Sequence, residues 1–124
     1  MKTSSCKNKG RLLQQFVAKL IATSFELSPD DVVSRPMGSP SCDIMMSPLA
    51  QKRFPISVEC KNSKAKPGPD SLEQAKYNCY KDTTPVVAWK PHRAPMDRTL
   101  VIMELIDLIN LIKRIRVKDE TETR

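Results

Sequence analysis

The sequence predicts an α/β domain, in which a mixed sheet of about five strands is flanked by helices. A helical pattern opens the chain, short β-type runs occupy its middle, and a strongly apolar helical segment follows the last predicted strand. The predicted order is helix, three strands, helix, two strands and helix, which is typical of α/β proteins. With 124 residues, the chain has the length of one domain.

Residues 1–9 are polar and basic, and we expect a flexible leader there. The first helix is expected over 10–23, because apolar side chains recur on one face. Counted from Leu13 at about 100° per residue, that face also holds Phe16, Val17, Leu20 and Ile21. Gln14 falls at the edge of this face, whereas Gln15 falls on the opposite side, which faces water.

Three short strands are expected next, at residues 32–34, 42–46 and 56–61. A loop at 36–41, which contains proline and glycine, separates the first two strands, and a connector at 47–55 with two prolines precedes the third. Apolar and polar residues alternate cleanly in the third strand. Glu59 and Lys61 therefore share one face of it.

The second helix is expected to begin at Ser71, because Ser71 and Gln74 have the spacing of a capping box. Two further strands are expected at 85–89 and 99–103. The last helix, 104–116, is apolar nearly all around, so it is buried either wholly within the monomer or partly against a second subunit. Residues 117–124 are a charged tail, and a single domain spans 10–116.

The charge balance points to a polyanionic partner. The chain has 21 Lys and Arg against 14 Asp and Glu, a net charge of +7, which suits nucleic acid or an anionic membrane surface. Aromatic residues are only 5%, so the chain has few side chains on which bases could stack. We find no signal-peptide pattern and no membrane-spanning segment. Four cysteines without a C-x-x-C pair fit a reducing cytoplasm rather than a zinc site.

Asp43, Glu59 and Lys61 are the candidate catalytic residues. The connector between the two strands is long enough to return Glu59 beside Asp43, and two adjacent carboxylates repel each other unless a cation lies between them. An oxygen-only site suits Mg²⁺ or Mn²⁺, and the Cys60 backbone carbonyl can add another oxygen. Lys61 can then orient a water for phosphodiester hydrolysis. The alternative is that Glu59 and Lys61 belong to an ordinary solvated strand face.

Asp43 followed by Glu59-Cys60-Lys61 resembles the D…(D/E)-x-K signature of the PD-(D/E)XK nuclease superfamily. The context resembles archaeal-type Holliday junction resolvases and their bacteriophage relatives over roughly residues 9–112. The matching segments are Lys9-Gly10-Arg11, Gly38-Ser39, Asp43-Ile44, Val58-Glu59-Cys60-Lys61-Asn62 and Ser71-Leu72-Glu73-Gln74-Ala75. The resemblance implies a restriction-endonuclease-like core around the central sheet.

The chain departs from that pattern at two positions. Cys42 stands where the superfamily has a proline before the aspartate, and Gln14 stands where the archaeal enzymes have a glutamate on the first helix. Gln14 can offer an oxygen to a metal ion or to its water, but it brings no charge. Glu26 lies in the following connection, and we prefer Gln14 as the site residue.

The resemblance implies a homodimeric, Mg²⁺-dependent endodeoxyribonuclease that resolves four-way DNA junctions in recombination and repair. Its metal would be held by Asp43, Glu59 and the Cys60 carbonyl, and no small-molecule cofactor or membrane is involved. Expected DNA contacts are Arg11, Arg35, Ser39, Lys64, Lys66, Gln74 and Lys76. Gln74 has a second interpretation, as the capping partner of Ser71. A phage-encoded enzyme of this kind would work in the cytoplasm of its bacterial host.

Two alternative functions remain at this stage. The same nuclease core could nick or restrict duplex DNA instead of junctions. Because Gln14 replaces an acid, the chain could also be a catalytically silent DNA-binding module.

Overall fold

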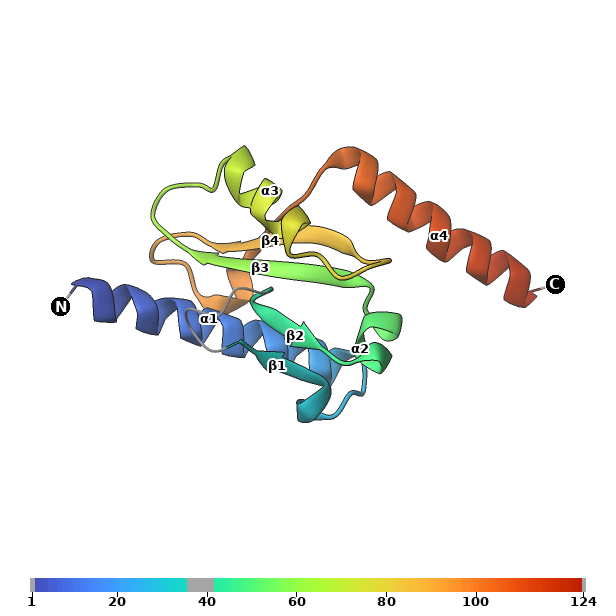
Figure 1. Cartoon of the computed structure of the whole chain (residues 1–124), viewed down its shortest axis with the longest axis horizontal. Helices are drawn as coiled ribbons and strands as arrows, with labels where there is room; N and C mark the ends of the chain where they lie inside the picture. Colours follow the sequence, from blue (N-terminus) through green and yellow to red (C-terminus); the bar gives the residue numbers. More distant parts are fainter. Residues whose placement is uncertain (1, 36–41, 124) are drawn as a thin grey trace.

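The computed structural model describes residues 2–35 and 42–123, and it confirms an α/β architecture (Figure 1). Its helices are α1 (Lys2–Ser24), α2 (Pro48–Arg53), α3 (Pro69–Tyr77) and α4 (Leu105–Thr123). Its strands are β1 (Val32–Ser34), β2 (Ile44–Met46), β3 (Ile56–Asn62), β4 (Thr84–Lys90) and β5 (Leu100–Ile102). Two short 3-10 helices, Pro29–Asp31 and Met96–Arg98, precede β1 and β5.

The strands form two sheets among the described residues, whereas the sequence predicted one sheet of five. β1 and β2 pair antiparallel, and the second sheet has the order β3-β4-β5, with β3 and β4 parallel and β4 and β5 antiparallel. β1 and β2 have only 3 residues each. β2 lies against β3 without a ladder, because a side chain occupies the edge of β3 where a ladder would continue.

Two helices cover opposite faces of the β3-β4-β5 sheet. α1 packs against β3 and also against β1 and β2, whereas α3 packs against β4 and β3 (Figure 1). The register places Val58 beside Val86 and Glu59 beside Val87. Because successive side chains alternate between faces, Val58 and Val86 face the α1 core, and Glu59 and Val87 face the α3 side.

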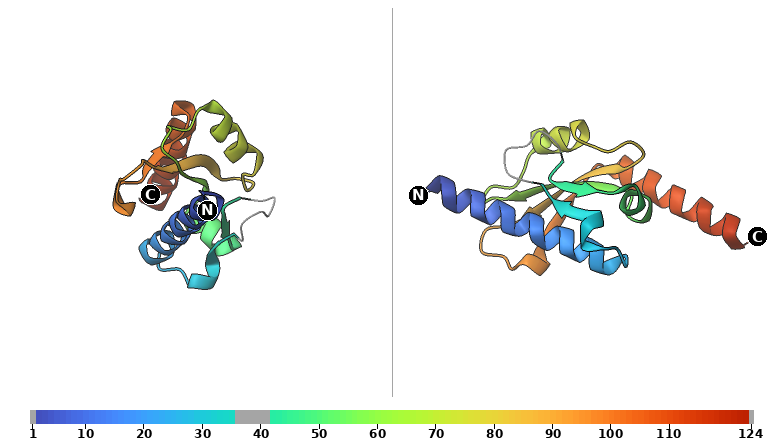
Figure 2. Two further views of the ribbon diagram at one scale, coloured as in Figure 1. Left: turned by 90° about the vertical axis from the view of Figure 1, so that its left-hand side faces the viewer. Right: turned by 60° about the horizontal axis from the view of Figure 1, so that its bottom comes forward.

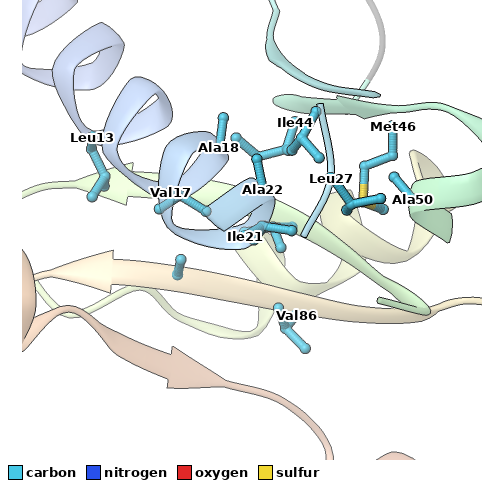
Figure 3. Packing of buried hydrophobic residues seen from close by; sticks show 13 residues of the cluster. Leu13, Val17, Ala18, Ile21, Ala22, Leu27, Ile44, Met46, Ala50 and Val86 are labelled. Carbon is cyan, nitrogen blue, oxygen red and sulfur yellow. The ribbon is translucent and has the colours of Figure 1, made fainter. Parts of the chain in front are cut away.

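The buried face of α1 is wider than the predicted one. Leu13, Val17 and Ile21 point toward the β3-β4-β5 sheet, while Ala18 and Ala22 lie beside Ile44 of β2 (Figure 3). The small alanines let the helix approach the second sheet closely. Leu20, predicted to be in the core, is 54% exposed, because the helix turns that residue away from β3.

The ends of the chain differ from the prediction. Residues 2–9, predicted as a leader, form the first turns of α1, since no proline interrupts the segment and the single Gly10 costs only about 1 kcal/mol. The predicted tail continues α4 as far as Thr123. Strongly helix-forming Lys and Glu residues explain this continuation.

Two local predictions were wrong for reasons of capping. Residues 48–53, predicted as part of a connector, form α2: Pro48 is its first residue, and the Ser47 hydroxyl accepts a hydrogen bond from the Ala50 N–H. α3 begins at Pro69 rather than at Ser71, and Gly68 caps it without a side-chain bond. Ser71 therefore makes no capping box with Gln74.

α4 projects beyond the sheets, and the two described ends of the chain lie at opposite ends of the molecule (Figure 2). The helix was predicted to be buried on more than one side. Within this chain its apolar side chains are instead exposed, by 38% at Leu108 and by 71% at Leu105. No helix of the described residues is long and apolar enough to cross a membrane.

We expect Leu13→Ala to lower the free energy of unfolding by about 2–5 kcal/mol, because Leu13 is fully buried and the truncation leaves a cavity between α1 and the sheet. Urea unfolding followed by circular dichroism measures the change. The matched control is Leu20→Ala on the exposed side of the same helix, which should cost much less. Equal losses in the two variants would contradict this packing of α1.

Candidate active site at the seam between the two sheets

The two sheets meet at the Asp43 carboxylate, in a region that we call the seam. Asp43 directly precedes β2 and is only 5% exposed. Its Oδ2 accepts a hydrogen bond from the Cys60 N–H of β3 at 2.7 Å, and its Oδ1 accepts one from Arg35 Nη2 at 2.9 Å. The backbone N–H of Arg35 also donates to the Asp43 carbonyl at 2.8 Å. A buried carboxylate is thus held between both sheets by an ion pair and a backbone donor.

Glu59 lies next to this carboxylate and is 4% exposed. Burial, followed by the negative charge of Asp43, raises the pKa of Glu59 from 4.5 to about 7. The cations of Lys61 and Arg35 oppose this rise. The spacing of the strands had predicted that the two carboxylates meet, and the structure brings them together with Lys61 beside them. Lys61 is half-buried, two residues further along the same face of β3.

Gln14 faces the seam from α1. The helix projects Gln14 about 100° around its axis from Leu13, between the residues that contact the β3-β4-β5 sheet and the alanines beside β2. The Asn62 side chain bonds the Lys9 carbonyl. From this bond, Gln14 lies five residues along α1, at about 1.5 Å per residue. The same distance back along β3, at about 3.3 Å per residue, leads to the level of Glu59 and Cys60. The side chain is 5% exposed, so Gln14 occupies the middle of the buried face rather than its edge.

The seam gathers every unpartnered buried polar side-chain atom found in the described part of the chain. They are Gln14 Oε1, Glu59 Oε1, Arg35 Nε and Arg35 Nη1. Such atoms are rare in native interiors, because each one costs roughly 1–3 kcal/mol if no partner compensates it. Two of them are acceptors that suit a cation, and two are donors that suit an anion. The seam therefore suits groups that the described residues themselves do not supply.

The oxygen donors of the seam fit a hard divalent cation such as Mg²⁺, which proteins often hold through one or two carboxylates. Each Asp43 oxygen keeps a second lone pair beyond its hydrogen bond. Because the N–H and C=O of one strand residue point to the same side, the Cys60 carbonyl faces the seam with its N–H. The described residues contain no cluster of three or more His, Cys, Asp or Glu that could hold a metal. Any metal site here therefore depends on the two carboxylates and on neutral oxygens.

The remaining predicted contacts are spread over the surface. Lys64 and Lys66 are exposed in the connection between β3 and α3, and Arg11 is exposed on α1. Gln74 is also exposed, and no hydrogen bond joins its side chain to the seam. Lys76 is paired with Glu73 and Glu104, so its charge is already balanced within the chain. Ser39 lies outside the described residues.

Sequence reasoning missed two supports of the seam. Arg35 was expected only as a DNA contact, although it also neutralises Asp43. The Tyr80 hydroxyl accepts the Met46 N–H at 3.2 Å, and the Tyr80 N–H donates to Ser57 Oγ at 2.9 Å. Tyr80 thus ties β2 to β3 from the end of α3. Its position just after a predicted helix was the only available signal.

Comparisons with known proteins add no relative, since no family model, curated protein or solved structure matches this chain.

We expect Arg35→Gln to lower the free energy of unfolding by about 3 kcal/mol, because it leaves the buried Asp43 carboxylate without its cation. Urea unfolding at neutral pH measures this loss. Lys52→Gln removes an exposed cation from α2 and should change stability by less than about 0.5 kcal/mol. An Arg35→Gln protein as stable as the control would contradict the role of this ion pair.

Proposed function

We propose that this protein is a Mg²⁺-dependent endodeoxyribonuclease that cleaves branched DNA, with four-way junctions as its preferred substrate. The observation that carries the proposal is the buried group of Asp43, Glu59 and Gln14 oxygens beside Lys61, with acceptor atoms that lack partners. The net charge of +7 supports a polyanionic substrate. The resemblance of the D…E-x-K pattern to the resolvases supports the choice of junctions.

In this proposal, Asp43 and Glu59 hold the metal ion, and Gln14 and the Cys60 carbonyl contribute neutral oxygens. The bound metal supplies Lewis acidity toward a phosphodiester oxygen. Lys61 holds the attacking water on the Glu59 side of β3 and offsets phosphate charge. Arg35 pairs with Asp43 and holds it in place, and its two unpartnered N–H groups suit a phosphate oxygen.

We also infer a restriction-endonuclease-like core. Placing the two sheets edge to edge in the order β1-β2-β3-β4-β5 produces a mixed five-stranded arrangement, with α1 and α3 on opposite sides. Support comes from the contact of β2 with β3 and from the Cys60–Asp43 hydrogen bond between them. In this arrangement Asp43 and Glu59 lie where β2 meets β3.

A second copy of the chain is the partner that we propose for α4. The exposed apolar residues of α4 and β5 are Leu100, Val101, Leu105, Ile106, Leu108, Ile109, Ile112, Ile115 and Val117. Together they offer roughly the 800 Å² that one partner contributes to a standard interface. A two-fold dimer also presents two active sites to a junction in which two strands are cut symmetrically.

Two competing functions make different predictions about substrate and cleavage. A duplex nuclease of the same core would cut linear DNA as readily as a junction. A silent binding module would hold a junction without cutting it, and the uncharged Gln14 is the observation that favours it. In that case Gln14→Glu is the substitution expected to introduce activity.

We expect Asp43→Asn and Glu59→Gln to reduce junction cleavage on the order of 10³-fold or more. Loss of either charge weakens metal binding, and with it the several kcal/mol by which a bound metal stabilises the transition state. Binding should persist, since the basic surface is unchanged. Cleavage of an immobile four-way junction, with and without Mg²⁺ and beside a linear duplex of matching sequence, measures the first effect. Fluorescence anisotropy without metal measures the second.

Glu26→Gln is the matched control, because it removes an exposed carboxylate outside the seam. It should cleave at the parent rate. Paired, metal-dependent cuts in the junction alone would support the proposal. Undiminished cutting by Asp43→Asn or Glu59→Gln would refute this active site.

We expect the parent protein to be a dimer in solution, with twice the 14.0 kDa mass of one chain. Ile112→Glu should shift the equilibrium toward monomer. A charge at this half-exposed position would be buried without a partner in a dimer. Light scattering after size exclusion measures the mass. Asn110→Glu adds the same charge to the same helix at an exposed polar position and should remain dimeric. A monomeric parent chain would contradict the proposed dimer.

A further inference from the structure

A separate basic surface lies at the end of the β3-β4-β5 sheet, where β3 and β4 finish. A groove of about 300 Å³ is lined there by Lys9 of α1, Lys90 at the end of β4, and His92 and Arg93 in the turn that follows. We call it the basic groove. Its lining includes no acidic residue from the part of the chain that the structure describes.

The fold brings these four residues together from distant parts of the sequence. The Asn62 side chain at the end of β3 donates to the Lys9 carbonyl at 3.2 Å, which fixes α1 against the sheet end. The Ala94 N–H donates to the Pro91 carbonyl at 3.1 Å and closes the turn after β4. Arg93 has φ 66° in this turn, a conformation that favours glycine. The turn therefore places two basic side chains on one wall of the groove.

The electrostatic setting of the groove is uniformly positive. Local desolvation, followed by the charges of Arg93, Lys9, Lys64 and Lys90, lowers the pKa of His92 below 6.5. The charges that dominate this shift are all cationic. The free groove is thus an assembly of cations without an internal counter-ion, which is the electrostatic pattern expected of an anion-binding surface.

We propose that the basic groove binds the phosphodiester backbone of the DNA strand that enters the seam. This inference rests on the proposed function and adds to it the path of the DNA. Asn62 lines the groove three residues after Glu59, so the groove begins about 10 Å further along β3, on the α1 side of the strand, whereas Glu59 faces the α3 side. With one phosphate per about 3.4 Å of axis on each strand, a strand that passes around the end of β3 would place in the groove a phosphate that lies at least about three nucleotides from the scissile one.

The lining favours a nucleic-acid backbone over a small free anion. The groove is larger than one phosphate, and its cations come from α1, the end of β4 and the turn that follows. Leu12 and Met96 contribute apolar surface to the same lining. Alternating cationic and apolar surface suits the phosphates and sugars of a strand, respectively.

The first test uses the single histidine of the chain as a probe. NMR titration of the His92 imidazole in the intact protein, in EDTA, measures its pKa alone and with a saturating 20-base-pair duplex whose binding is verified by anisotropy. We expect the duplex to raise the pKa by about 1–3 units, the effect of an opposite charge within hydrogen-bonding reach. An unchanged His92 pKa in the DNA complex would overturn the proposal.

A parallel titration with inorganic phosphate distinguishes the source of the anion. The proposal expects a small shift at millimolar phosphate. A full shift with phosphate alone, at concentrations where DNA has no further effect, would assign the groove to a free anion and overturn the backbone proposal.

The second test removes charge from the groove. Without metal, Lys90→Gln combined with Arg93→Gln should reduce the steepness of log affinity against log salt by about 2, because each neutralised phosphate contributes about 0.9. The charge-matched control is Lys19→Gln combined with Lys52→Gln, two exposed lysines outside the groove. The control should keep the parent slope. Equal slopes for the groove variant and the parent would count against the proposal.

These measurements separate the groove from the nuclease activity, because neither of them reads cleavage. A DNA-induced His92 shift in a protein that never cuts would support the groove and reject the nuclease. Metal-dependent cleavage with an unaffected His92 would support the nuclease and reject the groove.

Discussion

The burial of the Asp43 carboxylate is the constraint on which this structure depends. A buried charge is costly unless it is paired and hydrogen-bonded, and the chain meets this cost with partners from both of its sheets. Arg35 follows β1, and Cys60 belongs to β3, so satisfying one carboxylate connects the two sheets. The same bonds occupy the β3 edge, so the sheets meet at a polar seam rather than through a continuous ladder.

Around that seam, α1 acts as a shared support. Its larger apolar side chains pack on the β3-β4-β5 sheet, and its alanines pack on β2 (Figure 3). The side chain that falls between these two sets is Gln14, which is why an amide is buried in the middle of an apolar face. A polar residue in such a position is easily mistaken for the edge of an amphipathic helix.

The fold class and the order of the elements other than α2 were predictable because they depend on local periodicity. β3 and α1 form where the alternation and the helical period predict them, although β3 is buried on both faces at Ser57, Val58 and Glu59. The errors arose where capping or burial decides between states of similar local energy. Gly68 rather than Ser71 precedes α3, and a proline that looked like a breaker became the first residue of α2. The apolar pattern of α4 indicated burial, but most of its apolar side chains stay exposed within the part of the chain that the structure describes.

The sequence by itself determined the α/β class, the net positive charge, and the pairing of Glu59 with Lys61 on one strand face, because composition and a two-residue period are local properties. Only the tertiary structure decided that Arg35 neutralises Asp43 and that Gln14 is fully enclosed in the middle of the buried face of α1. It also decided that Lys9 joins Lys90 and His92 at one groove, although 81 residues separate Lys9 from Lys90. Such long-range contacts depend on how helices pack on sheets, and local sequence patterns do not predict that packing.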